Sequence, residues 1–222
     1  MPVISFASPK GGAGKTTSAL VLATELAVNK QSVIVLDSDP NQAINAWASI
    51  KGCPAGLEVV PDVTEQNILD LIDDAAERAT FVIIDLEGTA NMCVSYAIGR
   101  SDLVVIPTQC SQLDIREAGK AIALVKQQEK AFRLTIPFKL LLTRTSSAIR
   151  SRTMKYIEEE IEQAGIPRFE VEMIERDAFK ALHSFGGTLE ELNPKDVGGL
   201  QKAIVNAEAF ATEIIETLKE GK

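Results

Sequence analysis

The fold of this chain is decided by one stretch near its start, Ser8-Pro9-Lys10-Gly11-Gly12-Ala13-Gly14-Lys15-Thr16-Thr17. An apolar run at residues 3–7 precedes it, and a segment with helical periodicity at residues 18–28 follows it. This order of strand, glycine-rich turn and helix suits a phosphate-binding loop. Glycines let successive backbone N–H groups face an anion, and the helix N-terminus adds partial positive charge. The stretch therefore predicts a phosphate site.

The loop departs from the common pattern G-x-x-x-x-G-K-[ST], because Pro9 stands at a position that is usually glycine and Lys10 follows it. Lys15 is expected to reach the β- and γ-phosphates, and the Thr16 hydroxyl to ligate magnesium. The residues expected to hold the phosphates are Gly11, Gly12, Ala13, Gly14, Lys15, Thr16 and Thr17. A glycine turn without a ligand is the alternative. Three glycines and two lysines within seven residues argue against it.

Two further apolar runs carry acids to what we expect to be the same edge of a sheet. Residues 32–36 form a β-branched run that ends in Asp37-Ser38-Asp39-Pro40, and residues 81–84 lead to Asp85. Ligands bind at the carboxyl ends of parallel strands. We therefore expect Asp37, Asp39 and Asp85 to complete the magnesium site with Thr16, partly through water. An aspartate that caps a turn is the alternative for Asp85.

The rest of the chain alternates between strand-like and helix-like segments. Further strands are expected at 57–60, 103–107, 138–143 and 169–174. Pro40 is expected to open a helix that contains Trp47. Further helices are expected at 64–79 with Thr64 as cap, and at 114–132, 148–164, 176–185 and 195–218. This alternation predicts an α/β fold: a three-layer, doubly wound, mostly parallel sheet with helices on both faces.

Composition limits the class of protein. The chain has 222 residues, of which 45% are hydrophobic and 24% charged, so we expect a single domain spanning 1–222. We expect neither a transmembrane helix nor a signal peptide. Cys53, Cys93 and Cys110 lack metal-ligand spacing and fit a reducing cytoplasm. The net charge of -8 argues against extensive coating of nucleic acid, although it allows a local basic patch. His183, the only histidine, is expected to be a surface or satisfied helix residue.

Together, the loop, the Asp37 strand end and the Asp85 strand resemble the ParA/MinD family of deviant Walker-type P-loop ATPases over nearly the whole chain. Residues 101–109 are similar to the family's segment before its interface helix. Leu140-Leu141-Leu142-Thr143-Arg144 is similar to its base-binding strand end, which implies base contacts from Thr143 and Arg144. Residues 113–118 and 175–179 are most similar to the ParA-like partition branch, near the DNA-transfer-associated partition-like ATPase of plant-transforming bacteria.

The resemblance implies a mechanism. Lys10 would be the signature lysine that crosses a dimer interface to the partner's ATP, as an arginine finger does. Lys15 and Asp39 would complete the catalytic set, with Asp39 orienting the attacking water and Asp37 supporting the magnesium shell. ATP with Mg²⁺ would hold a homodimer together, and hydrolysis to ADP and phosphate would release it. Asn41 and the Leu86-Glu87-Gly88-Thr89 segment depart from the family pattern.

The resemblance also implies a cargo role: partition or positioning of DNA or another cargo by a cytoplasmic, nucleoid-associated protein, with a stimulating partner of the ParB kind. Non-specific DNA binding in the ATP state would use Arg150, Arg152 and Lys155, near Arg144. A solvated helix end balancing the acids at 158–160 is the alternative. The acidic last helix argues against membrane attachment of the MinD kind.

Two alternatives come from other classes of protein. One is a nucleotide-dependent scaffold that recruits a partner protein without hydrolysis. The other is an iron–sulfur reductase-type relative, which would need paired cysteines around a dimer axis. Cys93 follows Asp85, but glycine-flanked cysteine motifs are missing from the sequence.

Overall fold

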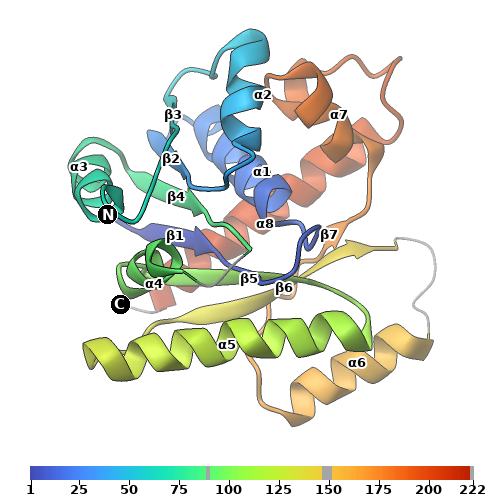
Figure 1. Cartoon of the computed structure of the whole chain (residues 1–222). Coiled ribbons are helices and arrows are strands. Elements are labelled where there is room, and N and C mark those ends of the chain that lie inside the picture. Colours follow the sequence, from blue (N-terminus) through green and yellow to red (C-terminus); the bar gives the residue numbers. More distant parts are fainter. Residues whose placement is uncertain (89–90, 147–151, 221–222) are drawn as a thin grey trace.

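The computed structural model describes residues 1–88, 91–146 and 152–220 (Figure 1). Arg150, Thr89 and the first residues of the helix expected at 148–164 lie outside the described residues.

Within the described residues, seven parallel strands form one sheet in the order β3-β2-β4-β1-β5-β6-β7 (Figure 1). The sheet is thus parallel throughout, which confirms the predicted fold class. The strands are β1 (Val3–Phe6), β2 (Val33–Asp37), β3 (Leu57–Val60), β4 (Phe81–Asp85), β5 (Leu103–Gln109), β6 (Phe138–Thr145) and β7 (Met173–Ile174).

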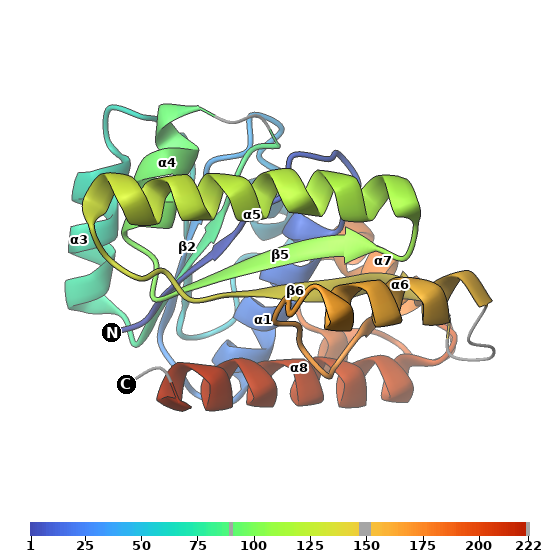
Figure 2. The ribbon, with the colours of Figure 1, turned by 90° about the horizontal axis from the view of Figure 1, so that it is seen from below.

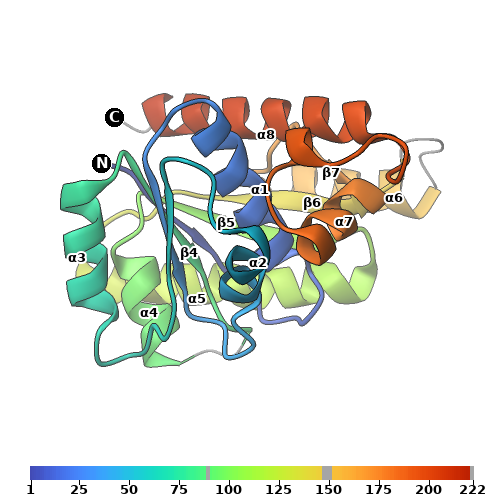
Figure 3. The ribbon, with the colours of Figure 1, turned by 90° about the horizontal axis from the view of Figure 1, so that it is seen from above.

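Helices cover both faces of the sheet (Figures 2 and 3). One face packs against α1 (Lys15–Val28), α2 (Ala43–Lys51), α7 (Asp177–Phe185) and α8 (Leu200–Glu220), with the short 3-10 helix η1 (Leu189–Glu191) beside them. The other face packs against α3 (Ile68–Arg78), α4 (Met92–Gly99), α5 (Gln112–Phe132) and α6 (Arg152–Gln163). Side chains alternate along each strand, so Ile4 and Phe6 join the first core while Val3 and Ala7 join the second. Burial on both faces explains why the strands are continuously apolar.

The central strands bring their acidic ends together. β1 lies between β4 and β5, and its register pairs Phe6 with Asp85. β2 flanks β4 on the other side and pairs Asp37 with Asp85. The phosphate loop (residues 8–17) leaves β1 at this same edge, so loop and acids share one end of the sheet.

Pro40 does not open the following helix, contrary to the sequence expectation. It lies in a turn, and α2 begins at Ala43 after Gln42, whose φ is 45°. The Asp37 carboxylate accepts hydrogen bonds from the backbone N–H groups of Ile44 and Asn45, at 3.1 and 3.0 Å. A side chain from the neighbouring strand therefore fixes the start of α2.

The assignment of Thr64 as a helix cap is also wrong. Residues 65–67 form a turn, and α3 begins at Ile68 with Asn67 as its N-cap. The Asn67 side chain folds back onto the Thr64 N–H at 2.7 Å. This asparagine turn displaces the helix start by one turn.

The strand expected at 169–174 is shortened to β7, Met173–Ile174, because side chains of α8 form hydrogen bonds with backbone groups of this segment. Glu213 accepts the N–H groups of Glu170 and Val171, both at 2.8 Å. Asn206 accepts the Ile174 N–H and donates to the Glu172 carbonyl. The last helix begins at Leu200 instead of residue 195, directly after Gly199 with φ 69°.

Among the helices of the described residues, none combines the length and apolar character needed to cross a bilayer.

Candidate functional site

The phosphate loop forms one wall of a cavity of about 530 Å³ at the carboxyl edge of the sheet. The opposite wall comes from the turn after β2 and the segment after β4. The lining residues of this first cavity are Gly11, Gly12, Ala13, Gly14, Lys15, Thr16, Thr17, Asp39, Pro40, Asn41, Glu87, Gly88 and Arg144. Every residue expected to bind phosphate lies on it.

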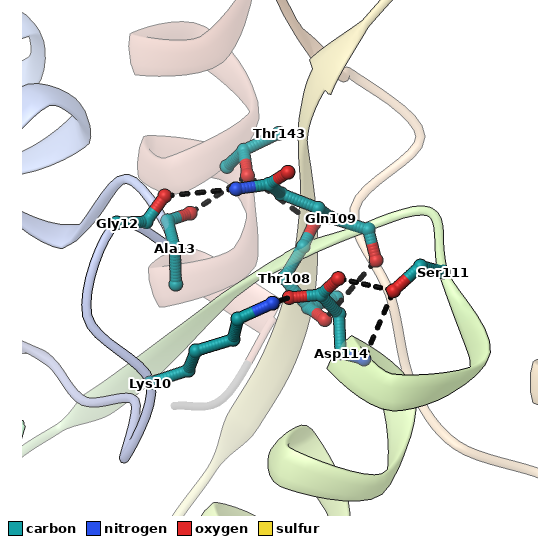
Figure 4. A network of polar contacts seen from close by, with 8 residues as sticks. All are labelled: Lys10, Gly12, Ala13, Thr108, Gln109, Ser111, Asp114 and Thr143. Atoms are coloured by element: carbon teal, nitrogen blue, oxygen red, sulfur yellow. Dashed lines mark hydrogen bonds and ion pairs between the residues drawn. The ribbon is translucent and has the colours of Figure 1, made fainter.

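Side chains from the ends of β5 and β6 hold the loop in shape (Figure 4). Gln109 donates from Nε2 to the Gly12 carbonyl at 2.9 Å, and the Thr143 hydroxyl donates to the Ala13 carbonyl at 2.7 Å. Gly14 has a φ of 99°, and a Cβ there would lie 3.3 Å from Thr143 Cγ2. Only glycine fits this position without strain. Thr143, expected as a base contact, is 3% exposed and supports the loop.

Lys10 is held within its own chain (Figure 4). Its Nζ lies 2.6 Å from Oδ1 of Asp114, in the first turn of α5. Ser111, the N-cap of α5, contacts the second oxygen of Asp114 and accepts the Asp114 N–H at 3.2 Å. Asp114 is only 5% exposed, whereas Lys10 is 34% exposed. The lysine tip therefore bridges the loop and α5 while one side of it remains open to solvent.

Asp85 is the best candidate for a cation ligand. It is fully buried, and neither carboxylate oxygen has a hydrogen-bond partner within the described residues. Burial raises the pKa of Asp85 to about 7, and the nearby Thr16 hydroxyl and Lys15 ammonium offset only part of this effect. Two unpartnered carboxylate oxygens beside a hydroxyl fit a hard cation such as Mg²⁺, which prefers oxygen ligands.

Asp37 and Asp39 occupy different places although both follow β2. Asp37 is buried, caps α2 as described above, and does not line the cavity. Its pKa is raised, mainly by burial, although backbone N–H groups oppose the shift. Asp39 does line the cavity and accepts hydrogen bonds from the backbone and side chain of Asn41, at 2.9 and 2.8 Å. Asp39 is thus placed to face a ligand, and Asp37 to position the Asp39 turn.

Lys15 and Gly88 line the first cavity and lie close to each other. Lys15 is 7% exposed, and its Nζ donates to the Ser8 carbonyl at 3.3 Å. A Cβ on Gly88 would lie 3.6 Å from that same Nζ and 3.4 Å from the Pro9 carbonyl. The Leu86-Glu87-Gly88 segment therefore packs directly against the loop. In the sequence, this segment is distinguished only by its departure from the family pattern.

A second cavity, of about 320 Å³, opens beside the first. The two share Gly14, Thr17 and Arg144. The remaining residues lining the second cavity are Ser18, Thr143, Met173, Ile174, Glu175, Arg176, Phe179, Lys180 and His183. Its apolar and polar side chains suit a heterocyclic base. Residues 175–179 stand out in the sequence for their family resemblance, but no sequence pattern indicates that they line a cavity.

His183 contacts the phosphate loop from a separate helix. It lies on α7, half-buried, and its Nε2 is 3.2 Å from Thr17 Oγ1. Burial lowers the pKa of its imidazole. The residue is satisfied, as expected, but its partner belongs to the phosphate loop. A lone histidine in a helical segment carries no sequence signal for such a contact.

Arg152 and Lys155, two of the three DNA candidates, line neither cavity. Arg152 and Lys155 are exposed at the start of α6, which continues into the acids at 158–160. Arg144, in contrast, lines both cavities and has a φ of 52°.

A glycine-rich loop between β1 and α1, at the carboxyl edge of a parallel sheet with acids on the neighbouring strands, defines a P-loop NTPase fold. Residues 1–214 match the family model described as VirC1 protein. The chain is 40% identical over 220 residues to Protein ParA of Rhizobium radiobacter, with 99% of each chain covered. The chain therefore belongs to the VirC1 family, within the ParA/MinD group of P-loop proteins.

Solved structures support the fold. The ATP complex of a McdA variant from Cyanothece matches with a TM-score of 0.75 at 17% identity, over 96% of both chains. Cobyrinic acid a,c-diamide synthase from Mycobacterium smegmatis, with bound ATP analog and magnesium, matches with a TM-score of 0.73 at 14% identity. That match covers 100% of this chain and 97% of the other.

Proposed function

We propose that this chain is a ParA-type ATPase that binds ATP with Mg²⁺, dimerises in the ATP state and uses hydrolysis to drive partition or positioning of DNA or another cargo. The observation that carries the proposal is the loop-lined cavity to which Lys15, Thr16 and Asp39 contribute, with the buried Asp85 close to Thr16 and Lys15. The family's partition relatives support the same role, since the relative at 40% identity is named Protein ParA.

A bound ATP molecule would occupy both cavities. The first would hold the phosphates through loop N–H groups and Lys15, and the second would hold the base beside Arg144, Ile174 and Phe179. Thr16 and Asp85 would hold magnesium, which supplies positive charge to the phosphates, while Asp37 fixes the turn that carries Asp39.

Asp39 would orient the attacking water. Asp39 lines the first cavity, and its carboxylate accepts hydrogen bonds from the backbone and side chain of Asn41. Asn41 is thus a structural support, which gives a role to the departure from the family pattern. Phosphate release that disappears in Asp39→Ala would support hydrolysis, and phosphate release that persists in this variant would refute the assigned role. A complete lack of phosphate release in the wild type would favour the scaffold alternative.

Dimerisation would transfer Lys10 from Asp114 to a phosphate of the partner's ATP. Both are anions, so the exchange keeps the lysine paired. The test is the mass in solution with ATP, ADP and no nucleotide. Wild type is expected to dimerise with ATP alone, Lys15→Ala to stay monomeric in all three conditions, and Lys10→Ala to bind ATP without dimerising. A mass that does not change with nucleotide would refute the dimer.

DNA binding rests on Arg152 and Lys155, whose exposed positions in one helical turn allow phosphate contacts. The two copies in a dimer would add through avidity. Replacement of both residues by alanine should weaken ATP-dependent binding to DNA of any sequence and flatten its salt dependence. Unchanged binding and salt dependence would assign the two cations to the solvated helix end. The proposed ATPase would act in the cytoplasm, together with a ParB-like partner protein that stimulates its ATP hydrolysis.

A further inference from the structure

Thr17 lies at the boundary between the two cavities. It is in the first turn of α1, and with Gly14 and Arg144 it lines both the first and the second cavity. If the nucleotide occupies both cavities, as proposed above, the phosphate nearest the ribose must lie at this boundary. The inference that follows rests on that proposed function.

His183 reaches the boundary from a separate element. It stands on α7, which is anchored to the core by Ala178, Phe179 and Leu182. Just after α7, the Gly187 carbonyl accepts a hydrogen bond from the indole of the buried Trp47 at 3.1 Å. A helix fixed in this way holds the imidazole in place, with Nε2 at 3.2 Å from Thr17 Oγ1.

We propose that His183 is a positioning residue for the nucleotide: its Nε2–H donates to Thr17 Oγ1, so that the Thr17 hydroxyl proton points at the α-phosphate. A hydroxyl has one proton and two lone pairs. When a lone pair accepts from the imidazole, the proton is left for an anionic oxygen. In the opposite arrangement Thr17 donates to Nε2 and presents only lone pairs to the phosphate, which would repel it.

The imidazole can donate in the form it adopts here. A neutral imidazole has one N–H, which can be on Nε2. Burial lowers the pKa of His183, so the neutral form predominates at pH 7. A hydroxyl that donates to a charged phosphate forms a charge-assisted hydrogen bond, which is roughly twice as strong as a neutral one, so loss of this donor should weaken nucleotide binding.

The first test reads the proton directly. His183 is the only histidine in the chain, so its imidazole signals in a ¹⁵N–¹H spectrum need no assignment. The expected result is a protonated Nε2 and a bare Nδ1, with both signals moving when ADP is added. A bare Nε2 in the ADP complex would overturn the proposal. This measurement uses the wild-type protein and does not depend on how a variant folds.

The second test is a double-mutant cycle on ADP affinity. His183→Leu should weaken ADP binding about tenfold, which corresponds to about 1.4 kcal/mol. His183→Gln, whose amide can also donate, should recover most of the loss. In a Thr17→Val background His183→Leu should have no further effect, because His183 acts through that hydroxyl. Additive losses would mean that His183 contacts the nucleotide itself and would overturn the proposal.

Controls separate this idea from the proposed function. Ser184→Ala, at an exposed neighbour on α7, should bind ADP like the wild type. If wild type binds no ADP, the proposed function fails. If wild type binds ADP and His183→Leu binds equally well, only the role of His183 fails.

Discussion

The pair formed by Lys10 and Asp114 leads to a prediction about dimer affinity. If Lys10 must leave Asp114 to reach the partner's ATP, then weakening the pair within one chain should strengthen the dimer. Asp114→Asn removes the carboxylate charge and keeps the side-chain shape. Its amide oxygen can still accept a hydrogen bond from the Ser111 hydroxyl, and its backbone N–H can still donate to Ser111, so the start of α5 should persist.

The magnitude follows from the exposure of the two partners. Exposed ion pairs contribute about 0–1 kcal/mol, whereas breaking a buried pair costs about 3–5 kcal/mol. With Lys10 34% exposed and Asp114 5% exposed, we assign about 1 kcal/mol to the charge. Two lysines are released per dimer, so the gain is about 2 kcal/mol, or about 30-fold in the dimer dissociation constant.

Sedimentation equilibrium with a non-hydrolysable ATP analogue measures this constant. Asp73→Asn is the matched control, because Asp73 forms an ion pair of the same 2.6 Å length with Arg100 on an exposed surface. In a Lys10→Ala background Asp114→Asn should change nothing. An unchanged or weaker dimer in Asp114→Asn, or equal tightening in the control, would refute the exchange of partners.

Three further predictions concern stability and the loop. The pKa of the buried Glu25 is raised to about 7, chiefly by burial, so its contribution to stability falls as pH rises from its unfolded value of 4.5 through 7. Glu25→Gln should therefore gain about 2 kcal/mol over wild type at pH 8 and little at pH 4 in urea unfolding; equal gains at both pH values would contradict this. Gly14→Ala should cost about 1–3 kcal/mol in the same assay and abolish ATP binding, because of its φ and its contact with Thr143; normal ATP affinity would show that the loop tolerates a side chain. Trp47→Phe should lower the free energy of unfolding by about 2 kcal/mol, because it removes the bond to Gly187 and leaves a void; a loss near zero would mean that α2 and α7 repack.

Much of the fold could be predicted because its signals are local. The strands that end in Asp37 and Asp85 are continuous apolar runs, and such runs occur where both faces of a sheet are covered. The errors occur where a side chain of another element sets the boundary. Asp37, at the end of β2, fixes the start of α2 a few residues further on, and the distant Glu213 and Asn206 of α8 bind backbone groups of the segment that contains β7. No pattern within those segments encodes these partners.

The sequence by itself determined the glycine-rich loop and the acids that end the neighbouring strands, and it predicted phosphate binding, because glycine spacing and strand ends act over a few residues. Only the tertiary structure decided which aspartate faces the cavity, that Lys10 rests on Asp114, and that His183 meets Thr17. Each of these contacts joins residues at least 104 positions apart, or depends on which way a turn points. Tertiary packing brings these residues together, and the sequence around each residue does not indicate its partner.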